Sequence, residues 1–317
     1  MGRLIRDTLV LVLVAACVPS CKEYRRCARI SSAGKGSVAA GSVTCSWKGH
    51  AGSCAPGPGE TLDLCVAAGF AADPGTRAGV EAFLDACGKG KADAVVALGD
   101  LGLDEDGIES TLKLLAGAGV PVLALPGSSE PYGGWLDAVE KVQDAGGPVV
   151  DLSRVRVLAW GGEALVGMPG IPNPRYLAHP GKGCGFDERD MDDLADLVEE
   201  GKEKGRVVVL SSYPPRGKIV DASREGVAIG DPGLAGILEA TGVLFGAFGS
   251  VYEAGGIGVD PADGSREDQG AWHKALFVNP GSIEAVPWEG GGGFSMGQAV
   301  MIQLGERGAR FSVWRRM

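Results

Sequence analysis

The stretch Ala92–Asp100, which reads ADAVVALGD, is the part of this sequence that indicates the fold most directly. Its centre is a short apolar run bounded by charged and turn-forming residues, a pattern typical of a buried strand. The run stops at Gly99 and Asp100, so a carboxylate follows the strand directly. In open α/β sheets, ligands bind beyond the carboxyl ends of the strands. Asp100 is therefore the first candidate functional residue.

Apolar strand-like runs alternate with helical patterns on both sides of this stretch. Further strands are expected at 62–68, 121–127, 155–160, 164–167, 206–211, 242–245, 275–278, 298–304 and 310–314. Helices are expected at 76–87, 107–118 and 187–203, and the last two strands are expected to form a hairpin. Strands alternating with helices predict an α/β fold with the helices outside.

Five motifs follow expected strand ends in a fixed order. They are GDLGLDEDG from Gly99, PGSSE from Pro126, LSSYPPRG from Leu210, GSVYEAGG from Gly249 and NPGS from Asn279. Their order and spacing resemble those of the calcineurin-like metallophosphoesterases, where the middle three read PGNHE, LTHxPPRG and GHVHEAGG. The resemblance covers about residues 61–317. It implies a metallophosphoesterase-like four-layer αββα sandwich over residues 60–317.

The resemblance also implies where a pair of metal ions would be bound. Carried over position by position, the family's ligands fall on Ala68, Phe70, Asp100, Ser128, Ser129, Ser212, Ser250 and Tyr252. Only Asp100 keeps a metal-ligating side chain, because hydroxyls are poor ligands for divalent transition metals and hydrocarbon side chains are none. Without two metals there is no route to a bound hydroxide near neutral pH. We expect no metal, no other cofactor and no catalytic residue, and we expect Asp100 to pair with a hydroxyl of Ser128, Ser129 or Tyr252.

Only three histidines occur in the chain, His50, His179 and His273, and none lies in a matched motif. We interpret each as a surface or packing residue. The rival hypothesis is an active metal-dependent phosphoesterase with an altered ligand set, in which Asp100 and Asp104 hold Mn, Zn or Fe. A further alternative pairs Glu130 or Glu253 with Asp100 as general acid and base.

The N-terminus has the features of an export signal. Arg3 and Arg6 precede the apolar run TLVLVLVAA at 8–16, which is too short to span a bilayer. The next residue is Cys17, and VAAC at 14–17 resembles a bacterial lipobox. We expect a signal peptide at 1–16 and lipidation of Cys17, with an ordinary signal peptide or cleavage before Cys21 as alternatives. By resemblance to Gram-negative lipoproteins, the absence of Asp after the lipidated cysteine, where Val18 stands, indicates the outer membrane.

Residues 17–59 are rich in cysteine and small residues, which predicts a tether rather than a packed domain. An exported chain meets an oxidising compartment, so Cys21, Cys27, Cys45 and Cys54 are disulfide candidates, with the pairing open. A zinc site is the alternative for these four. Cys65 and Cys87 are expected to be buried as small apolar residues.

The 317 residues carry a net charge of −10, which disfavours nucleic acid as a partner. We expect an exported lipoprotein that acts, without catalysis, as a binding or scaffold module. Its expected partners are the membrane, through the lipid, and an unidentified protein or small-molecule ligand. A third hypothesis is a structural envelope protein that functions through its lipid and tether alone.

Overall fold

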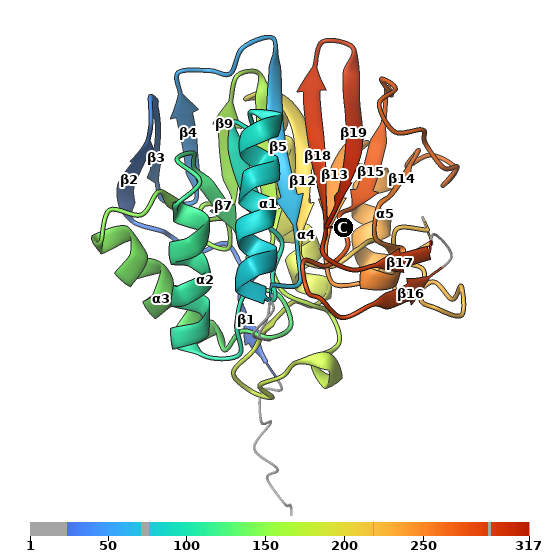
Figure 1. Ribbon diagram of the computed structural model, residues 1–317, viewed down its shortest axis with the longest axis horizontal. Coiled ribbons are helices and arrows are strands. Elements are labelled where there is room, and N and C mark those ends of the chain that lie inside the picture. The colour runs from blue at the N-terminus through green and yellow to red at the C-terminus, as the bar shows by residue number, and fades with distance from the viewer. Residues whose placement is uncertain (1–23, 71–75, 218, 291–292, 317) are drawn as a thin grey trace, which may run out of the picture.

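The computed structural model describes residues 24–70, 76–217, 219–290 and 293–316 (Figure 1). Two sheets lie face to face, and helices cover the outer side of each, which gives four layers. This confirms the expected α/β sandwich. No helix within the described ranges is both long and apolar enough to cross a membrane.

The smaller sheet has six strands. Their order is β19 (Gly308–Arg315), β18 (Gln298–Gly305), β5 (Thr61–Ala67), β6 (Ala94–Ala97), β7 (Val122–Ala124) and β8 (Val149–Asp151). Strands β5 to β8 are parallel, whereas β18 and β19 form the expected antiparallel hairpin. The outer face is covered by α1 (Thr76–Gly90), α2 (Glu105–Ala116) and α3 (Tyr132–Asp144).

The larger sheet has nine strands. Their order is β14 (Ile257–Val259), β15 (Leu276–Asn279), β13 (Phe245–Phe248), β12 (Arg206–Ser211), β10 (Glu163–Met168), β9 (Val157–Trp160), β4 (Ala51–Ala55), β3 (Val43–Lys48) and β2 (Lys35–Ala40). Strands β10, β12, β13 and β15 are parallel. Its outer face packs against α4 (Glu188–Lys202) and α5 (Pro232–Ala240).

In the part of the chain that the structure describes, four short strands and two 3-10 turns lie outside these sheets. Strand β1 (Arg25–Arg26) pairs with β11 (Cys184–Gly185), and β16 (Trp288–Gly290) forms a hairpin with β17 (Gly293–Ser295). Two 3-10 turns are η1 (Pro174–Tyr176) and η2 (Tyr252–Ala254).

Side-chain alternation along the strands divides the core into layers. In β5, Leu64 and Val66 point into the cluster between the sheets, while Cys65 and Ala67 pack under the helices. Successive residues of a strand face opposite sides of its sheet, so a strand buried on both faces has no polar side. This accounts for the continuous apolar runs at the centre of the sequence.

The tether expected at residues 17–59 is wrong for residues 35–55, which are part of the folded body. They form β2, β3 and β4, and β4 pairs in parallel with β9, so this segment extends the larger sheet. Cys45 and Trp47 are buried against the central core. These strands were not predicted because they consist mainly of small and polar residues. At this edge of the sheet, burial alternates along the strand, so no continuous apolar run marks them.

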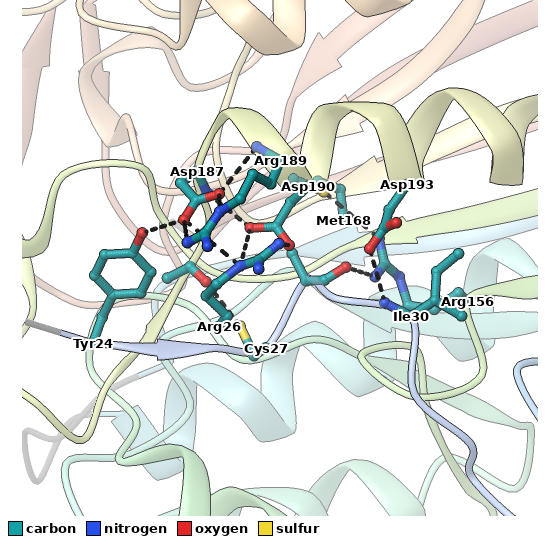
Figure 2. Close-up of polar contacts among 12 residues, drawn as sticks. Tyr24, Arg26, Cys27, Ile30, Arg156, Met168, Asp187, Arg189, Asp190 and Asp193 are labelled. Carbon is teal, nitrogen blue, oxygen red and sulfur yellow. Dashed lines mark hydrogen bonds and ion pairs between the residues drawn. The ribbon is translucent and has the colours of Figure 1, made fainter. Parts of the chain in front are cut away.

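Residues 24–30 are also fixed to the sandwich, as Figure 2 shows. The Tyr24 hydroxyl donates to Asp187 Oδ2 over 2.9 Å, and Arg26 Nη2 donates to Asp190 Oδ1 over 2.7 Å. The Ile30 amide donates to Asp193 Oδ2 over 3.2 Å. These carboxylates lie at the start of α4, so the chain is bound to the body from Tyr24 onward.

The disulfides differ in part from the expected set. Cys45 pairs with Cys54 within the candidate group, but Cys27 pairs with Cys184. Cys65 and Cys87, expected as free buried residues, are buried but form a disulfide that joins β5 to α1. Strand–helix packing brings these two together, which sequence spacing alone does not reveal. Cys17, Cys21 and the expected signal peptide lie outside the described residues.

Candidate functional site

The structure brings the eight family-matched positions to one end of the sandwich. Ala68 and Phe70 follow β5, Asp100 follows β6, Ser128 and Ser129 follow β7, Ser212 follows β12, and Ser250 and Tyr252 follow β13. Backbone hydrogen bonds join these strand ends, among them Phe70 N to Asp100 O at 2.7 Å and Gly249 N to Ser211 O at 2.9 Å. We call this place the vestigial centre, after the expectation from the sequence that its metal ligands are missing.

Asp100 accepts hydrogen bonds from three other residues of the vestigial centre. Its side chain is buried, and its backbone has a left-handed φ of +61°. Oδ1 accepts three hydrogen bonds of 2.8 Å, from the amides of Ser128 and Ser129 and from Ser128 Oγ. Oδ2 accepts from the hydroxyl of Tyr252. Each carboxylate oxygen has about two acceptor positions, so Oδ1 is fully occupied and Oδ2 accepts one hydrogen bond.

Tyr252 supplies the fourth donor from the first residue of η2. Its side chain is buried, and its ring lies 5.3 Å from the ring of Trp288 in the β16–β17 hairpin. Burial and the negative charge of Asp100 raise the pKa of Tyr252 well above its ordinary value. The phenol therefore keeps its proton at neutral pH and donates a hydrogen bond to Asp100. The hydroxyl partners expected for Asp100 include the two that the structure supplies, Ser128 and Tyr252.

Apolar groups occupy the matched positions beside β5. Phe70 is fully buried, and its ring meets Phe83 edge-on with centroids 6.0 Å apart. Gly69, with φ +63°, lies so close to the Tyr252 ring that a Cβ there would come within 2.9 Å of it. This side of the vestigial centre is filled by hydrocarbon.

The remaining serines have different surroundings. Ser212 Oγ donates to the carbonyl of Pro126 over 2.8 Å. Ser129 Oγ and Ser250 Oγ are buried and have no hydrogen-bond partner among the described residues. A buried polar group without a partner costs about 1–3 kcal/mol. A water molecule or a polar ligand atom that hydrogen-bonded to either hydroxyl would remove this cost.

Glu130 joins the loops after β6 and β7. Its carboxyl group is completely buried and accepts from the amides of Leu101 and Gly127, the latter over 2.8 Å. Burial, with the charge of Asp100 as a second cause, raises the pKa of Glu130 to about 8. Both oxygens accept from backbone amides, so Glu130 holds two loops together and its carboxyl group has no access to solvent as an acid or base.

Each of the three histidines has a hydrogen-bond or ion-pair partner other than Asp100. His50 Nε2 is 2.8 Å from Glu200, His179 Nε2 is 2.5 Å from the carbonyl of Leu103, and His273 Nδ1 is 2.8 Å from Glu267. Asp104 is engaged as the N-cap of α2, where Oδ1 accepts from Gly107 N over 2.9 Å. Across the described ranges, no group of three or more His, Cys, Asp or Glu side chains could hold a metal ion.

The donor set does not fit a pair of divalent ions. A cation at Asp100 would have to displace amide and hydroxyl hydrogens that already point at both oxygens. Hard divalent cations need several oxygen or imidazole ligands, and the neighbours here are hydroxyls, a phenol and hydrocarbon.

Comparisons with known proteins show similarity in fold. No family model matches the chain, and no curated protein matches it. One crystal structure has a TM-score of 0.59 and 14% identity, covering 80% of this chain and 98% of its own. A second crystal structure, of the protein TT1561 from Thermus thermophilus, has a TM-score of 0.56 and 13% identity, with coverage of 80% and 98%. A dimetal phosphatase from Danio rerio has a TM-score of 0.48 and 12% identity, with coverage of 80% and 99%. At these identities the first two similarities show the fold alone.

Proposed function

We propose that this chain is an exported lipoprotein whose metallophosphoesterase-like sandwich does not hydrolyse phosphate esters and serves as a binding or scaffold module. The observation that carries the proposal is the state of Asp100. Its carboxylate is the one metal-ligating side chain left at the matched positions, and both of its oxygens accept hydrogen bonds from protein donors.

This arrangement supplies for Asp100 what metal ions would otherwise supply. A buried carboxylate is costly unless it is paired or hydrogen-bonded. Here the hydrogen bonds offset that cost without a cation; they come from Ser128, Ser129 and Tyr252. The centre is therefore stable as a metal-free structure, and it lacks the bound hydroxide that two-metal hydrolysis requires.

The disulfides support export. Six cysteines form three disulfides in the described part of the chain, and disulfides persist mainly in oxidising compartments. Together with the lipobox-like sequence before Cys17, this favours a lipid-anchored protein of the bacterial envelope, with the outer membrane as the expected location. The proposed partner is a small-molecule ligand or a protein.

The rival hydrolase predicts a metal ion that depends on Asp100. The test is elemental analysis of the purified mature protein for Mn, Zn and Fe, together with turnover of a generic phosphodiester. We expect much less than one metal ion per chain and the same background turnover for wild type and Asp100→Ala. Stoichiometric metal and turnover that both disappear in Asp100→Ala would establish the hydrolase instead.

The anchor has a separate test in the native host. Cys17→Ser is expected to release the protein from the membrane fraction, because it removes the acylated side chain. Cys21→Ser is the matched control and is expected to stay in that fraction. Release by Cys21→Ser with retention of Cys17→Ser would move the anchor to Cys21, and retention of both variants would contradict lipidation.

A further inference from the structure

Exposed apolar side chains gather at the end of the molecule that holds the vestigial centre. Among the described residues, nine large apolar side chains are exposed, and eight of them lie in the connecting segments that follow the carboxyl ends of β6, β10, β12 and β15. We call these eight the rim: Leu103, Tyr176, Ile219, Val227, Ile229, Val286, Phe294 and Met296. The ninth, Leu244, precedes β13 at the opposite end. Grouped exposed apolar side chains mark interaction surfaces.

The N-terminal strand lies at the same end. The amide of Arg25 donates to the carbonyl of Gly183 over 2.8 Å, and Gly183 also bridges to Pro131 beside the loop of Ser128 and Ser129. A disulfide from Cys27 to Cys184 fixes this contact covalently. Figure 1 shows β1 at the lower edge of the molecule, below α1 and α2, and Figure 2 shows its side chains against the start of α4.

The distance from the proposed lipid to this strand is short. Six residues lie between Cys17 and Tyr24, and the seven steps of a fully extended chain from one to the other reach about 25 Å. A tether that ran to residue 59 would reach about 150 Å and would leave the orientation of the body open. Because the chain is bound to the body from Tyr24 onward, the lipid would hold the end with the rim close to the bilayer.

The chemistry of the rim suits a lipid surface. Tyr176, 68% exposed, has exposed Arg175 beside it and exposed Lys182 in the same connection, next to β1. Tyrosine is enriched at membrane interfaces, and basic residues near them are attracted to anionic lipid. Phe294, 61% exposed, belongs to the hairpin that packs on Tyr252 through Trp288.

We propose that the rim inserts into the surface of the bilayer that carries the lipid anchor, so that the vestigial centre faces the membrane. The proposal rests on the proposed anchoring at Cys17 for its orientation. The rim is proposed to contact lipid, and the competing possibility is that it contacts a protein partner.

The first experiment uses the lipidated protein on vesicles of phosphatidylethanolamine and phosphatidylglycerol that contain brominated acyl chains. Phe294→Trp adds a fluorophore at the rim, and Leu244→Trp adds one at the opposite end as a matched control. We expect the added fluorescence at position 294 to be quenched and that at 244 to be unchanged. If the vesicle-bound protein shows no added quenching at 294, the rim does not meet lipid and the proposal fails while the anchor stands.

A second experiment separates the rim from the anchor. The unlipidated Cys17→Ser chain is floated with the same vesicles at increasing lipid concentration. Phe294→Ser with Met296→Ser is expected to lower the partition coefficient about tenfold, the effect of about 1.4 kcal/mol of lost apolar insertion, and Leu244→Ser is expected to leave it unchanged. Equal partitioning of rim and control variants, or no partitioning at all, would overturn the proposal whatever the fate of the lipid.

Discussion

Replacing Tyr252 by phenylalanine removes one atom from the most constrained part of the vestigial centre. The ring and its packing against Trp288 remain, while Asp100 Oδ2 loses its hydroxyl donor. Both side chains are more than nine-tenths buried, so water cannot replace the donor without rearrangement. The lost interaction is a hydrogen bond to a charged group, and such bonds contribute about 1.5–3 kcal/mol.

Tyr213→Phe provides a matched control. The Tyr213 hydroxyl donates over 2.8 Å to the neutral carbonyl of Ile229, and this side chain is also buried. A neutral hydrogen bond contributes about 0.5–1.5 kcal/mol. The free energy of unfolding, measured in urea with the disulfides intact, is therefore expected to fall about 1 kcal/mol more for Tyr252→Phe than for Tyr213→Phe.

The double variant Tyr252→Phe with Asp100→Asn tests the pairing itself. Removing the carboxylate charge as well should recover part of the loss, because a neutral amide is less costly to bury without a donor. A Tyr252→Phe variant that is as stable as wild type, or no more destabilised than Tyr213→Phe, would refute the view that the phenol stabilises a buried charged Asp100.

Two further predictions concern stability. The pKa of Glu130 is about 8 when folded against an ordinary 4.5, so the folded chain keeps a proton that the unfolded chain has lost between these values. Its contribution is complete below pH 4.5 and declines as pH rises toward 8, by up to about 1.4 kcal/mol per pH unit. Glu130→Gln should flatten the pH dependence of the unfolding free energy in that window, and an unchanged slope would show that Glu130 does not hold the proton. The disulfides should differ by loop length: Cys27–Cys184 closes 157 residues and Cys45–Cys54 closes 9, so chain entropy predicts losses of about 5 and about 2.5 kcal/mol when each pair becomes serine. Equal losses in urea denaturation would contradict the entropic account of the longer link.

The sequence allowed the central strands and the place of the vestigial centre to be predicted. The strand at 206–211 was located to the residue, because four consecutive apolar residues, all buried, leave little choice. The strand expected at 242–245 lies three residues later, at Phe245–Phe248, since Gly242 and Val243 belong to the turn after α5. Helices α3 and α5 were missed because glycine and proline open them, which weakens the helical pattern.

The edge strands and disulfides were harder to predict for a different reason. β2 and β3 are joined by Gly41 and Ser42, a two-residue hairpin signal that was available in the sequence. The pairing of β4 with β9, which adds these strands to the larger sheet, depends on a contact between segments more than a hundred residues apart, and so does the pairing of Cys27 with Cys184. At the vestigial centre, the residue types predicted that Asp100 would seek a hydroxyl, but only the fold selects Ser128 and Tyr252 over Ser129 Oγ.

Calorimetric titration of the chelator-treated mature protein with Mn²⁺ and with Zn²⁺, beside Asp100→Ala, tests the central claim most directly. If hydrogen-bond donors have replaced metal ions around Asp100, the two proteins should give the same heats, without saturation at one or two ions per chain. Saturable binding by wild type that Asp100→Ala abolishes would contradict the account and restore a metal centre to this site.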